Sequence, residues 1–118
     1  MLAQYSEIVK NWAGQNPCIN RAWIFGSHAR GTATGRSDLD VAAEIAKASV
    51  DRWGMFRFWC RNGGPLQDDL RSRFAAVSPG LEVNLELYHR RLGSIVYDAI
   101  LRERIAPVYR RPRSGDRS

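Results

Sequence analysis

Lysine, cysteine and long apolar runs are all scarce in this chain of 118 residues. The only cysteines, Cys18 and Cys60, lack CxxC spacing and a neighbouring histidine, which disfavours a disulfide framework, a zinc site and a thiol catalyst. No apolar run approaches the length of a membrane span, and the polar residues within MLAQYSEIVKNW disfavour a signal peptide. We therefore expect a cytoplasmic protein with reduced thiols and no contact with a membrane.

Arginine supplies nearly all of the 18 basic residues, since the only lysines are Lys10 and Lys47, and the formal net charge is +6. The planar guanidinium group suits phosphate recognition because it donates two parallel hydrogen bonds. The alternative explanation for most of these arginines is a GC-rich coding bias, without a role in function. The positive charge disfavours an acidic DNA mimic or a calcium buffer and permits nucleotide, nucleic-acid or acidic-protein partners.

Hydrophobic periodicity predicts alternating helices and strands in one domain, since this length leaves no room for a second. Helices are expected over 2–12, 27–30, 49–60, 66–77 and 93–104, and strands over 22–25, 39–45, 81–88 and 106–109. Gly63-Gly64-Pro65 is expected to break the chain, and Trp53, Phe56 and Cys60 to pack into the core. The order predicts an α/β (α+β) domain over residues 1–109, with a small mixed sheet of three to four strands flanked by helices. Residues 110–118 are expected to form a disordered, Arg-rich tail.

The stretch GSHARGTATGRSDLD, residues 26–40, places a glycine turn ten residues ahead of an Asp-x-Asp. Gly26 lies where a strand passes into a helix, so a phosphate can approach the backbone closely, and Ser27 adds a hydroxyl donor. Asp38 and Asp40 share one face of a strand, where two carboxylates repel unless a cation lies between them. Mg²⁺ prefers carboxylate and phosphate oxygens, so the joint pattern indicates a metal-bound nucleotide, although each half alone is a weak signal.

The stretch GSHARGTATGRSDLDVA resembles the signature of the nucleotidyltransferase superfamily that includes DNA polymerase beta and kanamycin nucleotidyltransferase. More narrowly, it is similar to the minimal nucleotidyltransferases, whose signature is Gly-Ser, ten residues, then Asp-x-Asp. The residues on that pattern are Gly26, Ser27, Arg30, Gly31, Ser37, Asp38 and Asp40.

The resemblance implies Mg²⁺-dependent transfer of a nucleoside monophosphate, usually AMP from ATP, to a hydroxyl group with release of pyrophosphate. It places Mg²⁺ on Asp38 and Asp40 and the triphosphate on Gly26 and Ser27. Arg30 is expected to contact phosphate or to form a structural salt bridge. Ser37 is assigned to the nucleotide site by the same pattern, although a turn or capping role is the alternative.

The third carboxylate of the family falls at Val83-Asn84-Leu85, where asparagine stands in place of an acid. Asn84 cannot act as a carboxylate base, although its carbonyl oxygen can still approach a metal. Glu82 and Glu86 alternate with Asn84 on the same predicted strand face. We expect Glu86 to complete the metal site and to serve in catalysis, and a solvent-facing role is the alternative for both glutamates.

Many family members of this size are antitoxins that neutralise a helical HEPN ribonuclease by adenylylating it, so the resemblance implies a protein acceptor. Trp53, Phe58 and Trp59 exceed the needs of a small core and indicate an interface, with a partner protein or with a second copy of the chain. The alternative from another class is a binding module of the same fold, catalytically impaired at Asn84, that masks its partner. Nucleic-acid binding through the arginines is the least favoured hypothesis.

Overall fold

The computed structural model describes residues 2–34, 37–46 and 52–112. Along the chain lie α1 (Leu2–Gly14), β1 (Ile19–Phe25), α2 (Ser27–Arg30), β2 (Leu39–Ile45), α3 (Arg52–Ala75), β3 (Val83–Leu87), α4 (Ser94–Arg102) and β4 (Tyr109–Arg110). The four strands form one sheet in the order β3-β2-β1-β4. β1 pairs antiparallel with both β2 and β4, whereas β2 and β3 run parallel, as the helical crossover between them requires. The predicted mixed α/β fold is confirmed.

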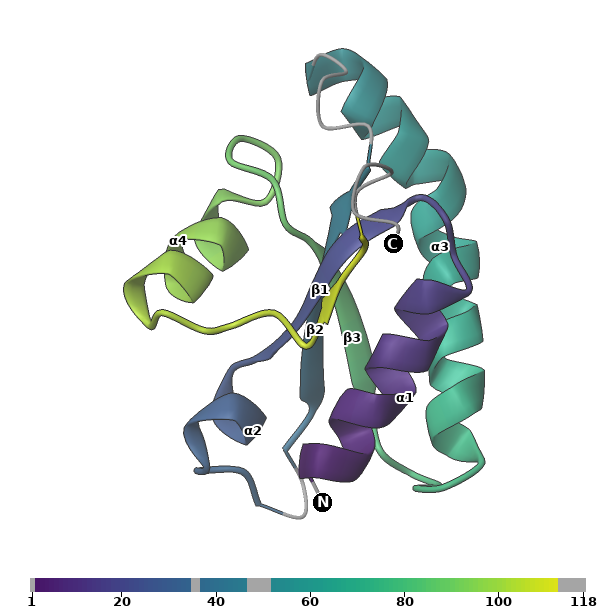
Figure 1. Ribbon diagram of the computed structural model, residues 1–118, viewed down its shortest axis with the longest axis vertical. Coiled ribbons are helices and arrows are strands. Elements are labelled where there is room, and N and C mark those ends of the chain that lie inside the picture. The colour runs from purple at the N-terminus through teal and green to yellow at the C-terminus, as the bar shows by residue number, and fades with distance from the viewer. Residues whose placement is uncertain (1, 35–36, 47–51, 113–118) are drawn as a thin grey trace.

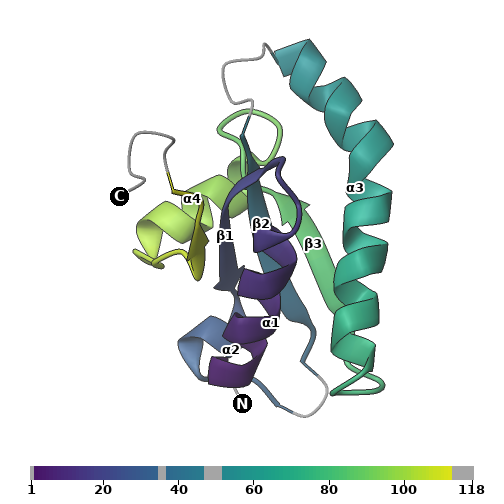
Figure 2. The ribbon, with the colours of Figure 1, turned by 45° about the vertical axis from the view of Figure 1, so that its right-hand side comes forward.

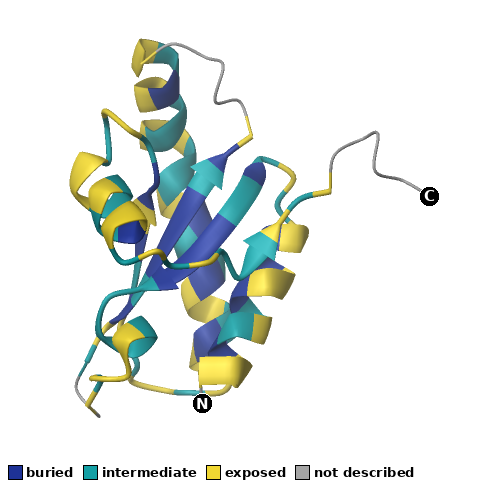
Figure 3. Cartoon of the chain, turned by 60° about the vertical axis from the view of Figure 1, so that its left-hand side comes forward, coloured by how far each residue is buried: buried dark blue, intermediate teal, exposed yellow. Residues whose placement is uncertain are grey.

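Helices cover the two faces of the sheet unequally (Figure 1). α1 and α3 pack together on one face, where Trp12, Leu70 and Phe74 join the apolar side chains of β1, β2 and β3 in the main core. On the other face a smaller cluster joins Trp23 of β1 and Tyr88, the residue after β3, to Ile100 of α4. Figure 3 shows buried residues concentrated on the strands, whereas exposed residues lie on the outer sides of the helices. Buried side chains alternate with partly exposed ones along β3, as the predicted alternation over LEVNLELY requires.

The predicted break at Gly63-Gly64-Pro65 is wrong, because α3 continues through all three residues. A tertiary contact holds the helix directly after the proline, because the Trp12 indole Nε1 donates to the Leu66 carbonyl at 3.1 Å. Before the proline, the Trp59 ring of the same helix packs close to Gly63, where an added Cβ would lie 3.1 Å from it. Pro65 itself is exposed. Burial of the apolar face therefore outweighs the local cost of the proline.

The prediction that Trp53, Phe56 and Cys60 pack into the core is also wrong. Trp53 is 61% exposed, Phe56 is 48% exposed, and Cys60 is exposed as well. The first turns of α3 extend beyond the end of the sheet (Figure 2). Most side chains of these turns therefore have no strand to pack against. Met55 is the exception, because its side chain is buried against Ile45 and Leu87 at the ends of β2 and β3.

The folded domain extends further along the chain than the predicted boundary at residue 109. Arg110 pairs with Arg21 in the sheet, and the Arg111 guanidinium donates to the carbonyls of Ile19, Ala13 and Asn16 at 2.9, 3.0 and 3.0 Å. The predicted tail is therefore wrong at its first residues, and residues 113–118 lie outside the described part of the chain. Within that part, every helix is too short or too polar to cross a membrane.

Candidate nucleotide and metal site

The glycine turn and the second aspartate meet at the end of β1. Phe25, the last residue of β1, is the pairing partner of Asp40 in β2. Gly26 then takes φ 77° and ψ −151°, a conformation essentially restricted to glycine. A Cβ at Gly26 would lie 2.5 Å from Asp40 Oδ2, too close for any residue with a side chain. Glycine therefore allows the backbone to approach the carboxylate. The structure thus brings together the two halves of the sequence motif.

Asn84 joins this group from the neighbouring strand. It is the pairing partner of Asp40 across the parallel β2–β3 ladder, and its Nδ2 lies 3.3 Å from Asp38 Oδ2 as a donor. Burial and the nearby charge of Asp38 raise the pKa of the Asp40 carboxyl. The Asn84 amide and the positive charges of His28 and Arg30 offset part of that rise.

Glu86 lies on the same face of β3, two residues beyond Asn84, and pairs with Ala42 of β2. Partial burial, together with the charge of Asp40, raises the pKa of the Glu86 carboxyl, so the two carboxylates interact electrostatically. Even so, no group of three His, Cys, Asp or Glu side chains within the described ranges could hold a metal ion. The structure gathers Asp38, Asp40 and the Asn84 amide, and the role of Glu86 stays a prediction.

Glu82 does not share the site, contrary to the expectation that it alternates with Asn84 on one face. It precedes β3 and forms a 3.0 Å salt bridge with Arg71 of α3. The same guanidinium donates to the Val83 carbonyl at 2.8 Å, and the Gln67 side chain accepts the Leu85 N–H at 3.1 Å. These two side chains of α3 bind backbone groups of the sheet's edge strand and so help to position Asn84.

The loop between Gly26 and Asp38 carries the other predicted nucleotide ligands. Ser27 opens α2 directly after the glycine. The Ser37 hydroxyl accepts the Thr34 N–H at 2.8 Å, the turn-forming role named as the alternative. Arg30 lies 3.5 Å from Glu103 in a half-exposed ion pair.

His28 belongs to the same segment, in α2, although it is not one of the motif residues, and its Nε2 is 3.3 Å from the Ser37 carbonyl oxygen. It lines a cavity of about 590 Å³ together with Tyr5 and Ser37.

Glu44 shares the strand phase of Asp38 and Asp40, but it belongs to a different cluster. The Arg21 guanidinium binds both of its carboxylate oxygens at 2.7 Å, and Asn20 donates a further hydrogen bond. A second cavity lies at the C-terminal end of β2 and is lined by His89, Arg90 and Arg91. The Gly-Ser and Asp-x-Asp motif does not predict this cavity. Three consecutive basic residues after a strand are the one sequence feature that points to it.

The donor set at Asp38 and Asp40 fits Mg²⁺. Two carboxylates on one strand face, open to a substrate that brings phosphate oxygens, are the usual protein contribution to a magnesium site. The Asn84 amide can present its oxygen to a cation by rotation about its last torsion, although it cannot supply negative charge. The residues therefore suit a hard divalent cation that arrives with a phosphorylated substrate.

Comparisons with known proteins agree with this fold. The profile of the nucleotidyltransferase domain family matches residues 4–103. The crystal structure of a toxin-antitoxin with AMP-PNP superposes with a TM-score of 0.60 at 17% identity, covering 90% of this chain and 73% of that one. The crystal structure of a mutant of the toxin-antitoxin MntA-HpeT gives 0.56 at 14% identity, covering 91% and 73%. No curated protein matches the chain by sequence.

Proposed function

Because the chain belongs to the family of nucleotidyltransferase domains, we propose that it transfers AMP from ATP to a hydroxyl acceptor in a Mg²⁺-dependent reaction. The observation that carries this proposal is the contact of the Gly26 turn with Asp40, completed by Asn84 from the next strand. A phosphate-accepting turn and a cation-binding carboxylate at that separation suit one metal-bound triphosphate.

Each residue of the site then has a defined part. Asp38 and Asp40 hold Mg²⁺, which when bound neutralises charge on the transferring phosphoryl group. Gly26 and Ser27 bind the triphosphate, with Arg30 adding positive charge and Ser37 fixing the loop beside them. The acceptor hydroxyl must lose its proton, and Asn84 cannot take it. Glu86, with its raised carboxyl pKa on the same strand face, is the carboxylate that can.

We further propose that the hydroxyl acceptor lies on a partner protein, such as a HEPN ribonuclease. Two similar structures are toxin-antitoxin proteins, and this chain presents an exposed aromatic pair in Trp53 and Phe56, whose rings lie 6.4 Å apart. Arginines flank the pair, and residues 52–67 contain no acidic side chain. An acidic, partly apolar surface is the complementary partner.

Titration calorimetry with ATP, with and without Mg²⁺, tests the nucleotide site. We expect Mg²⁺-dependent binding that Asp38→Asn abolishes, and Asn84→Asp is expected to strengthen it by restoring a third carboxylate. Glu86→Gln is expected to reduce AMP transfer while leaving binding in place. Absence of binding at millimolar ATP would contradict the proposal for the isolated chain.

The second candidate function is a masking module, and the absence of a three-carboxylate group among the described residues favours it. Asp38→Asn separates the two functions, since it abolishes transfer but leaves a pure binder intact. With a HEPN ribonuclease as the probe, Trp53→Ala with Phe56→Ala is expected to lose the complex in either case. Ile95→Ala, which removes an 85% exposed apolar side chain from α4, is the matched control.

A further inference from the structure

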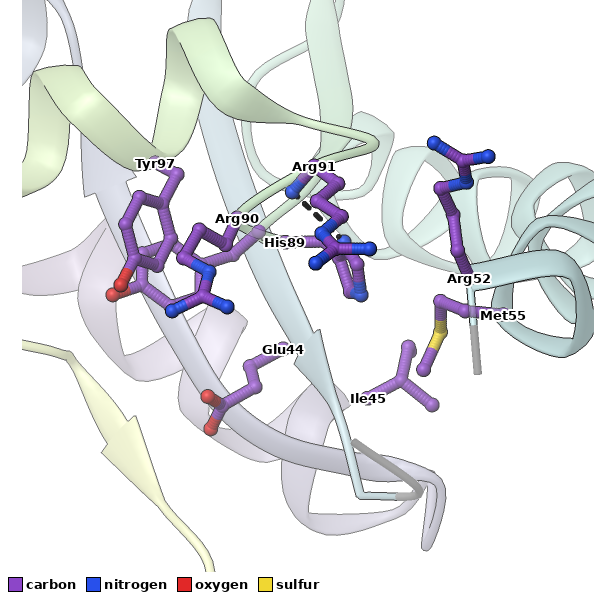
Figure 4. A pocket seen from close by; sticks show the side chains of 9 residues that line it. Glu44, Ile45, Arg52, Met55, His89, Arg90, Arg91 and Tyr97 are labelled. Carbon is purple, nitrogen blue, oxygen red and sulfur yellow. Dashed lines mark hydrogen bonds between the residues drawn. The ribbon is translucent and has the colours of Figure 1, made fainter. Parts of the chain in front are cut away.

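A second cavity, of about 390 Å³, lies between the first turn of α3 and the loop that joins β3 to α4. Figure 4 shows His89 and Arg91 side by side in the middle, with Arg90 between Tyr97 and Glu44 and Arg52 on the opposite side. Glu44 is four residues beyond Asp40 along β2, so this side of the cavity lies about 13 Å from Asp40 at the usual strand rise, and further from Asp38. It is therefore a separate site.

The positive charge of this cavity is not neutralised within the described part of the chain. Its one carboxylate, Glu44, is bound bidentately by Arg21 at 2.7 Å. Burial opposes ionisation of Glu44, but the hydrogen bonds from Arg21 and Asn20 hold its carboxyl pKa below the ordinary value. The four salt bridges among the described residues include neither Arg90 nor Arg91, and Arg52 stacks at 5.4 Å on the Trp53 ring.

His89 adds a neutral donor to these cations. Its Nδ1 accepts the backbone N–H groups of Arg91 and Leu92, both at 3.1 Å, so the neutral ring carries its proton on Nε2. Burial, followed by the charges of Arg91 and Arg90, lowers the pKa of His89. The imidazole thus shapes the loop through one nitrogen and leaves the other as a donor.

We propose that this cavity binds the phosphate group of a small phosphorylated ligand. Guanidinium groups and an imidazole N–H supply only donors, which suits an anion with several acceptor oxygens. The volume lies within the usual range for small-molecule pockets, and the concave shape suits such a ligand better than a flat partner surface. The inference is independent of the proposed transferase activity, because no residue of the Asp38–Asp40 site contributes to the cavity.

Calorimetric titration of the full chain in EDTA with inorganic phosphate, pyrophosphate and AMP tests the site. Without Mg²⁺ the two aspartates repel these anions, so binding reports on the cavity. Arg90→Ala with Arg91→Ala is expected to weaken binding by at least about tenfold, since charge-assisted hydrogen bonds from guanidinium groups to phosphate are among the strongest in proteins. Arg61→Ala with Arg102→Ala removes the same charge from exposed positions on α3 and α4 and is expected to change little. Equal weakening by both pairs would overturn the proposal in favour of nonspecific attraction.

Two further variants sharpen the test. His89→Asn keeps an acceptor for the Arg91 N–H but loses the distal donor, so it is expected to weaken phosphate binding without lowering the melting temperature. Asp38→Asn is expected to leave binding in EDTA unchanged even where it abolishes Mg²⁺-dependent ATP binding. Stronger phosphate binding in Asp38→Asn, together with unchanged binding in the Arg90 and Arg91 variant, would place the anion at the aspartates and overturn the assignment. Binding of AMP in preference to phosphate and pyrophosphate would identify the ligand as a nucleotide, and equal binding would identify a free phosphate.

Discussion

A single missing side chain at Gly26 allows the turn and Asp40 to meet, and this makes Gly26→Ala the sharpest test at the residue scale. An added methyl would meet both the unfavourable φ of 77° and the Asp40 carboxylate at 2.5 Å. We expect a loss of about 1–3 kcal/mol in the free energy of unfolding and a displaced carboxylate. Urea denaturation measures the first, and Mg²⁺-dependent ATP binding measures the second.

Gly31→Ala is the matched control, because Gly31 has a similar φ of 75° but nothing within 4 Å of an added Cβ. It is expected to cost about 1–2 kcal/mol through the backbone alone and to leave ATP binding unchanged. Equal loss of binding in both variants would show that loop strain, and not the contact with Asp40, disables the site.

At this same scale the sequence was a good guide to residues whose place follows from strand phase, as for Asp40 and Asn84. It failed for Glu82, because the partner that draws this side chain away, Arg71, comes from a distant helix. Ser37 likewise has a local hydrogen bond that no spacing rule distinguishes from a ligand contact.

At the scale of the element, α3 shows why local rules misplaced a boundary. Glycine and proline signal a break only if nothing else holds the helix, and here Trp12 and the buried Leu66 hold it across the junction. The outward stripe of Trp53 and Phe56 was misassigned for a related reason. Periodicity identifies a helical face but does not show which face meets the sheet.

Adjacent glycines in α3 provide a paired stability prediction. Apart from its chain neighbours, Gly64 has nothing within 4 Å of an added Cβ, but it directly precedes Pro65, whose Cδ disfavours a Cβ on a helical residue before it. Gly64→Ala is therefore expected to raise the free energy of unfolding by at most about 0.5–1 kcal/mol through helix propensity. At Gly63 the new methyl would lie 3.1 Å from the Trp59 ring, so Gly63→Ala is expected to gain less or to destabilise. Thermal and urea unfolding of the two variants compare them directly. An equal gain at both positions would show that the Trp59 ring moves aside freely.

At the scale of the whole molecule, the parallel pairing of β2 and β3 brings Asp40 beside Asn84. The sequence predicted a small mixed sheet, but it did not predict which strands pair. The order of Arg110 and Arg111 was not anticipated, because the Arg-rich composition from residue 110 onward is typical of a solvated tail. Arg111 is held by hydrogen bonds to carbonyl oxygens between the end of α1 and the start of β1. These oxygens converge only in the folded chain, so the local sequence does not reveal them.

Arg111 thereby ties the last described residues to the first helix and strand. Arg111→Ala is expected to lower the free energy of unfolding by about 2 kcal/mol, because it leaves three carbonyl groups without a charged donor and exposes the edge beside β4. Arg110→Ala removes the same charge from the exposed neighbour, whose sheet pairing uses only its backbone, and is expected to change the stability by less than about 0.5 kcal/mol. Urea denaturation of the two variants measures the difference. If both lose the same stability, net charge and not the tie to α1 explains the effect, and the domain ends before Arg111.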